Sequence, residues 1–169
     1  QRKTYYMFGA GSGITPLYSM IKTILEKEPQ SEIHLLYGNR EEENIIFREP
    51  LAQLATRYAG QLHVTHILSQ PRREKSKGIA GIFGKGTLTW QGKTGRIDAR
   101  QVNAFLDEHP ARTKEAESLV CGPGTMIEIV EQALKTRGID KKHIHSEHFT
   151  TAAIDDAVTD GSLVTAPAW

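Results

Sequence analysis

The sequence predicts an α/β fold in which a doubly wound parallel sheet of about five strands lies between two layers of helices. Two observations predict this three-layer arrangement. Runs rich in β-formers alternate with segments whose apolar residues recur at helical spacing, as in β-α-β units. A glycine-rich turn also joins the first such run to the first helical segment. A length of 169 residues, with 38% hydrophobic and 24% charged residues, suits one globular domain.

The first half of the chain contains two strand–helix pairs. Residues 4–8 form a β-rich run that stops at a glycine. Residues 14–28 have apolar side chains at helical spacing, and Pro16 suits the first turn of that helix, where its missing N–H costs nothing. Residues 32–37 form a second strand, and residues 42–59 a second helix that a central proline kinks or restarts.

The second half continues the alternation. The expected elements are a strand at 62–69, a short helix at 97–106, a strand at 118–121, a helix at 125–136 and a strand at 143–149. Asp98 suits the N-cap of the short helix, and Gly138 ends the last one. Strands spaced by helices imply right-handed crossovers and a parallel sheet.

Two stretches have no such pattern. Residues 70–96 contain no clear helix and are strongly basic, either as a solvated surface excursion or as a contact for phosphate or an acidic partner. The charges in this stretch are Arg72, Arg73, Lys75, Lys77, Lys85, Lys93 and Arg96 against Glu74 alone. Residues 150–169 are rich in Ala, Thr and Asp without a period, which predicts a tail or linker.

Composition excludes several classes of protein. A single cysteine excludes an internal disulfide, a Cys-type zinc site and an iron–sulfur cluster held within this chain. A net charge of +1 gives no indication of nucleic-acid binding. No apolar run approaches the roughly 20 residues of a membrane span, and no signal peptide is visible. We therefore expect a cytoplasmic protein with neither a membrane nor a nucleic-acid partner. Because the sequence starts with Gln1, we also expect a piece of a longer protein.

The glycine-rich turn is the first candidate site. Its residues, between the first strand and the first helix, are Gly11, Ser12, Gly13, Ile14, Thr15 and Pro16. Glycines let backbone approach a pyrophosphate, and the helix N-terminus supplies free N–H groups and the positive end of its dipole. The turn departs from the dinucleotide pattern Gly-x-Gly-x-x-Gly because Ile14 stands at the third glycine. A plain glycine-rich turn is the alternative.

The second candidate site follows the second strand, at Asn39 and Arg40. An acidic residue here would bind the ribose 2′-hydroxyl, whereas an arginine suits a 2′-phosphate. The acid is absent, so Arg40 favours NADP(H) unless it is only a surface charge. Ser69, Arg72 and Arg73 follow the third strand and would reach the same end of the sheet.

The third candidate site follows the fourth and fifth strands. Cys121, Gly122 and Pro123 precede a helix that contains Met126, and we expect Cys121 to point into the crevice. Glu147 and Phe149 end the last strand as a charge and an aromatic platform, or else as a solvated acid and a core residue. All of these residues follow strand ends, where open α/β sheets bind ligands.

Other patterns are weaker. The Gly-Lys fragments at 84–87 and 92–94 lack the spacing of a phosphate-binding P-loop. Tyr18 and Lys22 have the spacing of a short-chain dehydrogenase pair but lie in the first helix. We expect no metal site, because His63 and His66 would face opposite sides of a strand. His143 and His145 share a face but lack a third ligand.

Together these motifs resemble the NAD(P)-binding domain of the ferredoxin–NADP⁺ reductase superfamily over about residues 4–149. The resemblance rests on the motifs Gly11–Pro16, Tyr37–Arg40, Leu68–Pro71 with Gly95–Asp98, Cys121–Pro123 and Glu147–Phe149. Within the superfamily the chain is most similar to oxygenase reductases, including the phenylacetyl-CoA epoxidase reductase type. The resemblance implies a ferredoxin-reductase-like domain with strand order 3-2-1-4-5. It also implies hydride transfer from NAD(P)H to FAD, followed by single electrons to a 2Fe–2S centre.

The resemblance also implies residue roles. Gly11 to Thr15 would hold the pyrophosphate, and Arg40, Ser69 and Arg72 or Arg73 the adenosine ribose and 2′-phosphate. Cys121 and Gly122 would border the nicotinamide, while Glu147 and Phe149 approach its contact with flavin. The expected catalytic residues are therefore Cys121, Glu147 and Phe149. The full expected set of nucleotide-binding residues is Gly11, Ser12, Gly13, Ile14, Thr15, Pro16, Asn39, Arg40, Ser69, Arg72, Arg73, Cys121, Gly122, Pro123 and Met126.

The departures from the family concern the other domains. The flavin motif Arg-x-Tyr-Ser/Thr and the cluster cysteines are absent. We therefore expect an FAD domain before Gln1, an NAD(P)-binding domain at 1–149, and a linker at 150–169 that leads to a ferredoxin domain. The electron acceptor would be an oxygenase or a ferredoxin, and this piece alone would bind nucleotide weakly and catalyse nothing. The alternatives are a flavohaemoglobin-like reductase module and a non-catalytic, nucleotide-binding regulatory module.

Overall fold

The computed structural model describes residues 2–74, 87–113 and 115–148. The strands are β1 (Thr4–Ala10), β2 (Glu32–Asn39), β3 (Leu62–Leu68), β4 (Arg73–Glu74), β5 (Thr87–Leu88), β6 (Lys93–Thr94), β7 (Ala116–Gly122) and β8 (Ile144–His148). The α-helices are α1 (Ile14–Lys27), α2 (Arg48–Arg57), α4 (Ala99–Glu108) and α5 (Gly124–Thr136). Short 3₁₀ turns are η1 (Gly11–Gly13), η2 (Glu42–Asn44) and η3 (Lys141–His143).

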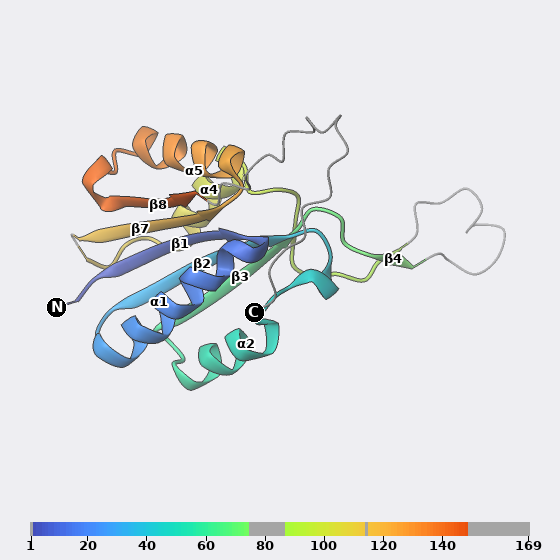
Figure 1. Ribbon diagram of the computed structural model, residues 1–169, viewed down its shortest axis with the longest axis horizontal. Coiled ribbons are helices and arrows are strands. Elements are labelled where there is room, and N and C mark those ends of the chain that lie inside the picture. Colours follow the sequence, from blue (N-terminus) through green and yellow to red (C-terminus); the bar gives the residue numbers. More distant parts are fainter. Residues whose placement is uncertain (1, 75–86, 114, 149–169) are drawn as a thin grey trace, which may run out of the picture.

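A parallel sheet of six strands forms the middle of three layers (Figure 1). Its order is β6-β3-β2-β1-β7-β8, and every pairing within it is parallel. Helices α1 and α2 pack on one face, and α4 and α5 on the other. The expected order 3-2-1-4-5 is confirmed, with β7 and β8 as the fourth and fifth strands.

The sixth strand, β6, was not expected. Lys93 and Thr94 pair with Ile67 and Leu68 at the end of β3, within the basic stretch at 70–96. Two residues are too few to show the alternation that identifies a strand in a sequence. In the same stretch β4 and β5 form a small antiparallel ribbon, so part of what we expected to be irregular is paired.

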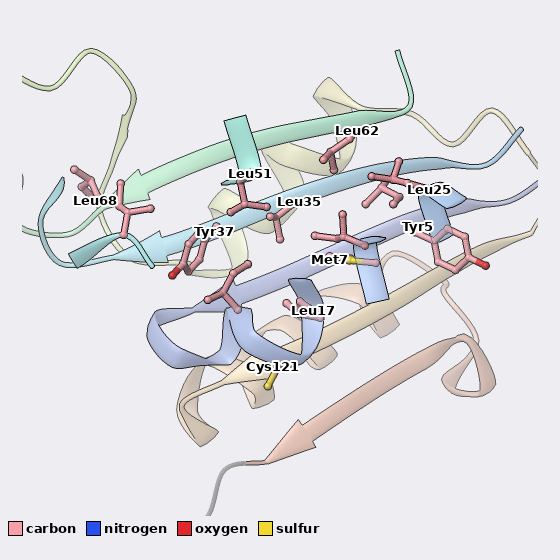
Figure 2. Packing of buried hydrophobic residues seen from close by; sticks show 14 residues of the cluster. Tyr5, Met7, Leu17, Leu25, Leu35, Tyr37, Leu51, Leu62, Leu68 and Cys121 are labelled. Carbon is pink, nitrogen blue, oxygen red and sulfur yellow. The ribbon is translucent and has the colours of Figure 1, made fainter. Parts of the chain in front are cut away.

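The core has two halves because β1 is covered on both faces. Neighbouring residues Met7 and Phe8 are both fully buried and belong to different clusters, as alternation along a strand requires. Figure 2 shows the half that faces α1 and α2, which includes Tyr37 of β2, Leu17 of α1 and Leu51 of α2. A central strand buried on both sides fixes the positions of the loops at its ends.

The second helix is shorter than expected. We expected it from residue 42, but residues 42–44 form a 3₁₀ turn and α2 begins at Arg48. Phe47 has φ 58°, a left-handed conformation that breaks a right-handed helix. Pro50 lies in the first turn of α2, where no intrahelical hydrogen bond is lost. The proline therefore marks a restart of the helix.

The order of the strands reverses direction at β1. The chain runs from β1 outward through β2 to β3, then returns to β7 on the other side of β1. Ligands of open α/β sheets bind at the carboxyl ends of the strands, at such a reversal. The candidate site therefore lies where the loops after β1 and β7 meet.

Candidate functional site

The glycine turn contacts the backbone of β7 directly. A Cβ on Gly13 would lie 2.2 Å from the carbonyl oxygen of Cys121 and 2.9 Å from the nitrogen of Gly122. Gly11 has φ +55°, and a Cβ there would meet nothing within 4 Å. Gly11 thus serves the turn, and Gly13 allows α1 to pack against β7. Both roles are distinct from the pyrophosphate contact that we expected of this turn, which stays a prediction. Ser12 and Thr15 are its exposed residues.

Two helices begin at this point without side-chain caps. The N-cap of α1 is Gly13 and that of α5 is Pro123, and neither makes a side-chain cap hydrogen bond. The first N–H groups of a helix have no partner within it and carry partial positive charge, although in α1 the N–H of Ile14 donates to the preceding 3₁₀ turn. Because Gly13 lies against Cys121 and Gly122, both N-termini border the same small region. That region suits a group with several negative oxygens.

Tyr37 was not among the expected site residues, but it supports the glycine turn. Its ring is fully buried beneath the turn, and its hydroxyl donates a hydrogen bond of 3.0 Å to the carbonyl oxygen of Gly11. Burial raises the pKa of this hydroxyl, so it stays a donor at neutral pH. The signal was present, because Tyr37 begins the motif that ends in Arg40.

The ends of β2 and β3 are tied together by backbone. Ser69 N donates to the carbonyl oxygen of Asn39 (3.0 Å), and Gln70 N donates to that of Arg40 (2.8 Å). Arg40 is exposed at this corner. The structure therefore brings Asn39, Arg40 and Ser69 together, as expected.

The basic residues after β3 are partly neutralised within the chain. Arg72 forms an ion pair with Glu43 (Nη2 to Oε1, 2.9 Å), and Lys93 forms one with Glu108 (2.6 Å). Arg73 is exposed at the start of the β4–β5 ribbon. Lys75, Lys77 and Lys85 lie outside the described residues. The described part of this stretch is thus less positive than its composition indicates.

The loop after β7 is built tightly around Gly122. A Cβ at this position would lie 2.8 Å from Cε of Met126 and 3.4 Å from Ala10. Met126 is buried, whereas Pro123 and Gly124 are exposed. Gly122 and Met126 therefore shape the floor of the region and Pro123 its surface.

Cys121 does not point into an open crevice as expected. Its side chain is 1% exposed and belongs to the cluster that packs against α1 (Figure 2). Side chains alternate between the two faces along β7, and that of Cys121 lies on the face that α1 covers. Burial, with a smaller effect of Glu147, raises the pKa of the thiol. Cys121 is therefore a neutral thiol at neutral pH, without the character of a nucleophile.

Glu147 lies beside Cys121 at the sheet edge. The two are register partners on β7 and β8, so they share a face, and Glu147 is exposed. Phe149, its expected companion, lies outside the described residues, as does the expected tail at 150–169. The structure thus assembles the turn after β1, the corner of β2 and β3, the loop after β7 and Glu147 along one edge.

Comparison with known proteins agrees with this arrangement. A model of the oxidoreductase NAD-binding domain family matches residues 7–132. The chain belongs to this family. Its similarities also place it in the ferredoxin–NADP⁺ reductase superfamily that its motifs predicted.

Two curated relatives illustrate the similarity. The chain is 35% identical over 147 residues to one subunit of the 1,2-phenylacetyl-CoA epoxidase of Escherichia coli (strain K12), covering 87% of this chain and 37% of that protein. It is 32% identical over 151 residues to the ferredoxin reductase component of 3-ketosteroid-9-alpha-monooxygenase from Rhodococcus rhodochrous, covering 89% and 35%. The chain thus spans little more than a third of the length of these relatives.

A solved structure shows the same fold. The CS-b5R domains of human Ncb5or in the NAD⁺ form are 27% identical, with a TM-score of 0.70 over 85% of this chain and 36% of that one. Within the described residues, no helix is both long and apolar enough to cross a membrane.

Proposed function

We propose that this chain is the NAD(P)H-binding domain of a flavin-dependent reductase, which passes electrons through FAD to an iron–sulfur centre or an oxygenase. One observation carries the proposal. The uncapped N-termini of α1 and α5 meet at the reversal point of the sheet, where Gly13 packs on the backbone of β7. Two partial positive charges at one point suit the pyrophosphate of a dinucleotide.

The nucleotide would extend in both directions from that point. Its pyrophosphate would lie over Ser12 and Thr15, with its adenosine end towards Arg40 and Ser69. Its nicotinamide would lie over the loop at Gly122 and Pro123, with Met126 below. Reduced nicotinamide supplies a hydride and flavin accepts it, so the protein needs to position these rings rather than to act as an acid or base.

Residues on the nicotinamide side would have passive roles. The thiol of Cys121 packs against α1, so Cys121 would contribute to this side only through its backbone, next to Gly122. Glu147, and Phe149 beyond it, would line the side from which the flavin approaches. Arg40 would bind a 2′-phosphate and favour NADP(H), while the pairing of Arg72 with Glu43 limits the help that Arg72 gives.

The rest of the proposed enzyme lies outside this chain. The relatives named above are reductase components or subunits of oxygenases, and this chain covers little more than a third of each. By analogy, residues 1–149 would follow an FAD domain, and residues 150–169 would link to a ferredoxin domain. The electron acceptor would be the oxygenase or ferredoxin served by the parent protein.

The proposal can be tested by calorimetric titration of the 169-residue chain with NADP⁺ and NAD⁺ in a buffer low in phosphate. The informative variant is Thr15→Glu, because Thr15 is exposed in the first turn of α1. A carboxylate there stabilises the helix by about 0.3–1 kcal/mol, yet repels a pyrophosphate. With two like charges about 6 Å away in water, the repulsion is about 1.4 kcal/mol, or roughly tenfold in affinity.

The matched control is Thr23→Glu, an exposed residue of the same helix two turns away. Nucleotide binding that Thr15→Glu weakens and Thr23→Glu leaves unchanged supports the site. Equal binding by both variants would contradict it. Stoichiometric FAD on the purified chain would contradict the separate flavin domain, and failure of both nucleotides to bind would contradict a nucleotide site in this chain.

A further inference from the structure

A cluster of ionisable side chains lies at the opposite edge of the sheet, at the amino ends of β2 and β3. Glu32 and His34 lie two residues apart on β2, so they share a face. His63 on β3 is the register partner of His34 and therefore joins them. One carboxylate oxygen and two ring nitrogens all lie within 4.8 Å of one another.

The spacing within this cluster is that of metal ligands. The Oε1 atom of Glu32 lies 3.3 Å from Nε2 of His34 and 3.2 Å from Nε2 of His63. Zinc holds nitrogen and oxygen ligands at about 2.0–2.1 Å in a tetrahedron, which places neighbouring ligand atoms about 3.3 Å apart. Two of the three distances between the proposed ligand atoms therefore already match a tetrahedral zinc site.

His34 lacks the hydrogen bonds that a buried imidazole needs. It is 3% exposed, and neither of its ring nitrogens has a hydrogen-bond partner among the described residues. An imidazole buried in this way stays neutral and has a lone pair available for a ligand. A buried polar group left in this state destabilises the fold unless a ligand satisfies it.

The surrounding residues hold the ligands in place. The ring of His109 stacks on His34 at a centroid distance of 4.6 Å, and Tyr6 stacks on the same ring at 5.7 Å. The Tyr6 hydroxyl donates to the carbonyl oxygen of His109. Arg112 contacts the other carboxylate oxygen of Glu32 at 3.4 Å, which leaves Oε1 facing the histidines. Such outer contacts orient metal ligands.

We propose that Glu32, His34 and His63 bind one divalent transition-metal ion of the Zn²⁺ class, with water or His109 as the fourth ligand. Neutral imidazole and carboxylate are ligands that such ions prefer. The rings of His34 and His63 are only 15° from parallel, so the ion requires one ring to turn. The His63 side chain is 37% exposed and can do so. We expected no metal site because His63 and His66 would face opposite sides of a strand; the pairing of His63 with His34 depends on the register of β2 and β3.

The ion would serve structure rather than redox chemistry. It would join β2 to β3 at the edge of the sheet away from the nucleotide site. An ion that binds only the folded chain raises its stability. We therefore expect bound metal to raise the melting temperature and to leave nucleotide affinity unchanged.

The test uses the chain without a histidine tag, stripped of metal. Co²⁺ is titrated while the visible absorption of tetrahedral cobalt is recorded, and Zn²⁺ is then added as a competitor. We expect one Co²⁺ per chain, displaced by Zn²⁺. Glu32→Gln and His63→Ala should each weaken binding by at least about tenfold. His145→Ala is the control, because His145 is an exposed histidine on β8 paired with Glu117.

Three results would overturn the proposal. The first is no cobalt signal and no change in melting temperature with Zn²⁺. The second is metal binding that survives both Glu32→Gln and His63→Ala. The third is loss of binding in His145→Ala, which would place the ion at His143, His145 and Glu117 instead. Circular dichroism of each metal-free variant separates loss of a ligand from loss of the fold.

Discussion

The contact between Gly13 and β7 predicts a large effect of a single methyl group. In Gly13→Ala, the new Cβ would lie 2.2 Å from the Cys121 carbonyl oxygen, whereas ordinary contact begins at 3.4 Å. The atoms it meets are backbone of a strand next to β1, so no side chain can rotate away. The glycine turn and β7 must instead separate by about 1 Å.

Overpacking of this kind costs about 3 kcal/mol at the upper end of its usual range. For a domain of this size, that loss lowers the melting temperature by about 6–12 °C. Urea denaturation followed by circular dichroism measures the free energy of unfolding directly. Calorimetry on the folded fraction should also show weaker nucleotide binding, because the N-terminus of α1 moves.

Two other glycines serve as matched controls. Gly124→Ala meets nothing within 4 Å at the start of α5 and should stabilise by about 0.4–1 kcal/mol. Gly11→Ala also has space, but its φ of +55° should cost about 1–2 kcal/mol. If Gly13→Ala unfolds within about 0.5 kcal/mol of the unmodified chain, the packing argument is wrong.

The remaining predictions concern single polar contacts. Arg40→Ala should lower the NADP⁺-to-NAD⁺ affinity ratio by about tenfold in calorimetry, because a charged hydrogen bond to the 2′-phosphate is lost; an unchanged ratio would refute that role. Glu43→Gln should raise the same ratio by freeing Arg72, and a fall would contradict this. Tyr37→Phe should cost about 1 kcal/mol in urea denaturation and loosen the glycine turn; unchanged stability and binding would exclude it as a positioning residue. Burial raises the pKa of Glu117, but hydrogen bonds to two histidines outweigh this and hold it below the usual 4.5. Its carboxylate therefore stabilises the fold above pH 4.5 and progressively less as the pH falls below it. Glu117→Gln should be less stable than the unmodified chain at pH 7, with a difference in stability that shrinks in acid. A difference that stays constant with pH would contradict a lowered pKa of Glu117.

The candidate site at the carboxyl ends of the strands could be predicted because its sequence motifs are local. The turn at 11–13 directly follows β1, the motif that ends in Arg40 forms the end of β2, and both carry their chemistry in consecutive residues. Parallel strands then bring such loops to one edge whatever their order. What local signals did not show is which atoms meet there. The partner of Gly13 is Cys121, more than a hundred residues away, and the orientation of Cys121 depends on which face α1 covers.

The ion pairs of exposed charges could not be predicted either. Arg72 and Glu43 follow different strands, and their pairing depends on side-chain reach that no spacing encodes. The positive charge counted along residues 70–96 therefore overstates what the folded surface presents. Buried groups obey stricter rules, because each must find a partner or stay neutral.

The histidine cluster at the amino edge shows a third kind of missing information, the register between strands. Glu32 and His34 form a pattern that alternation on one strand can reveal, but His63 joins them only because β2 and β3 pair residue 34 with residue 63. A shift of one residue would turn the His63 ring to the opposite face. The paired ends of β2 and β3 at the nucleotide edge depend on the same register, through the hydrogen bonds from Ser69 and Gln70. One pairing therefore sets both the corner proposed for the adenosine and the spacing proposed for the metal, although the two lie at opposite ends of the strands.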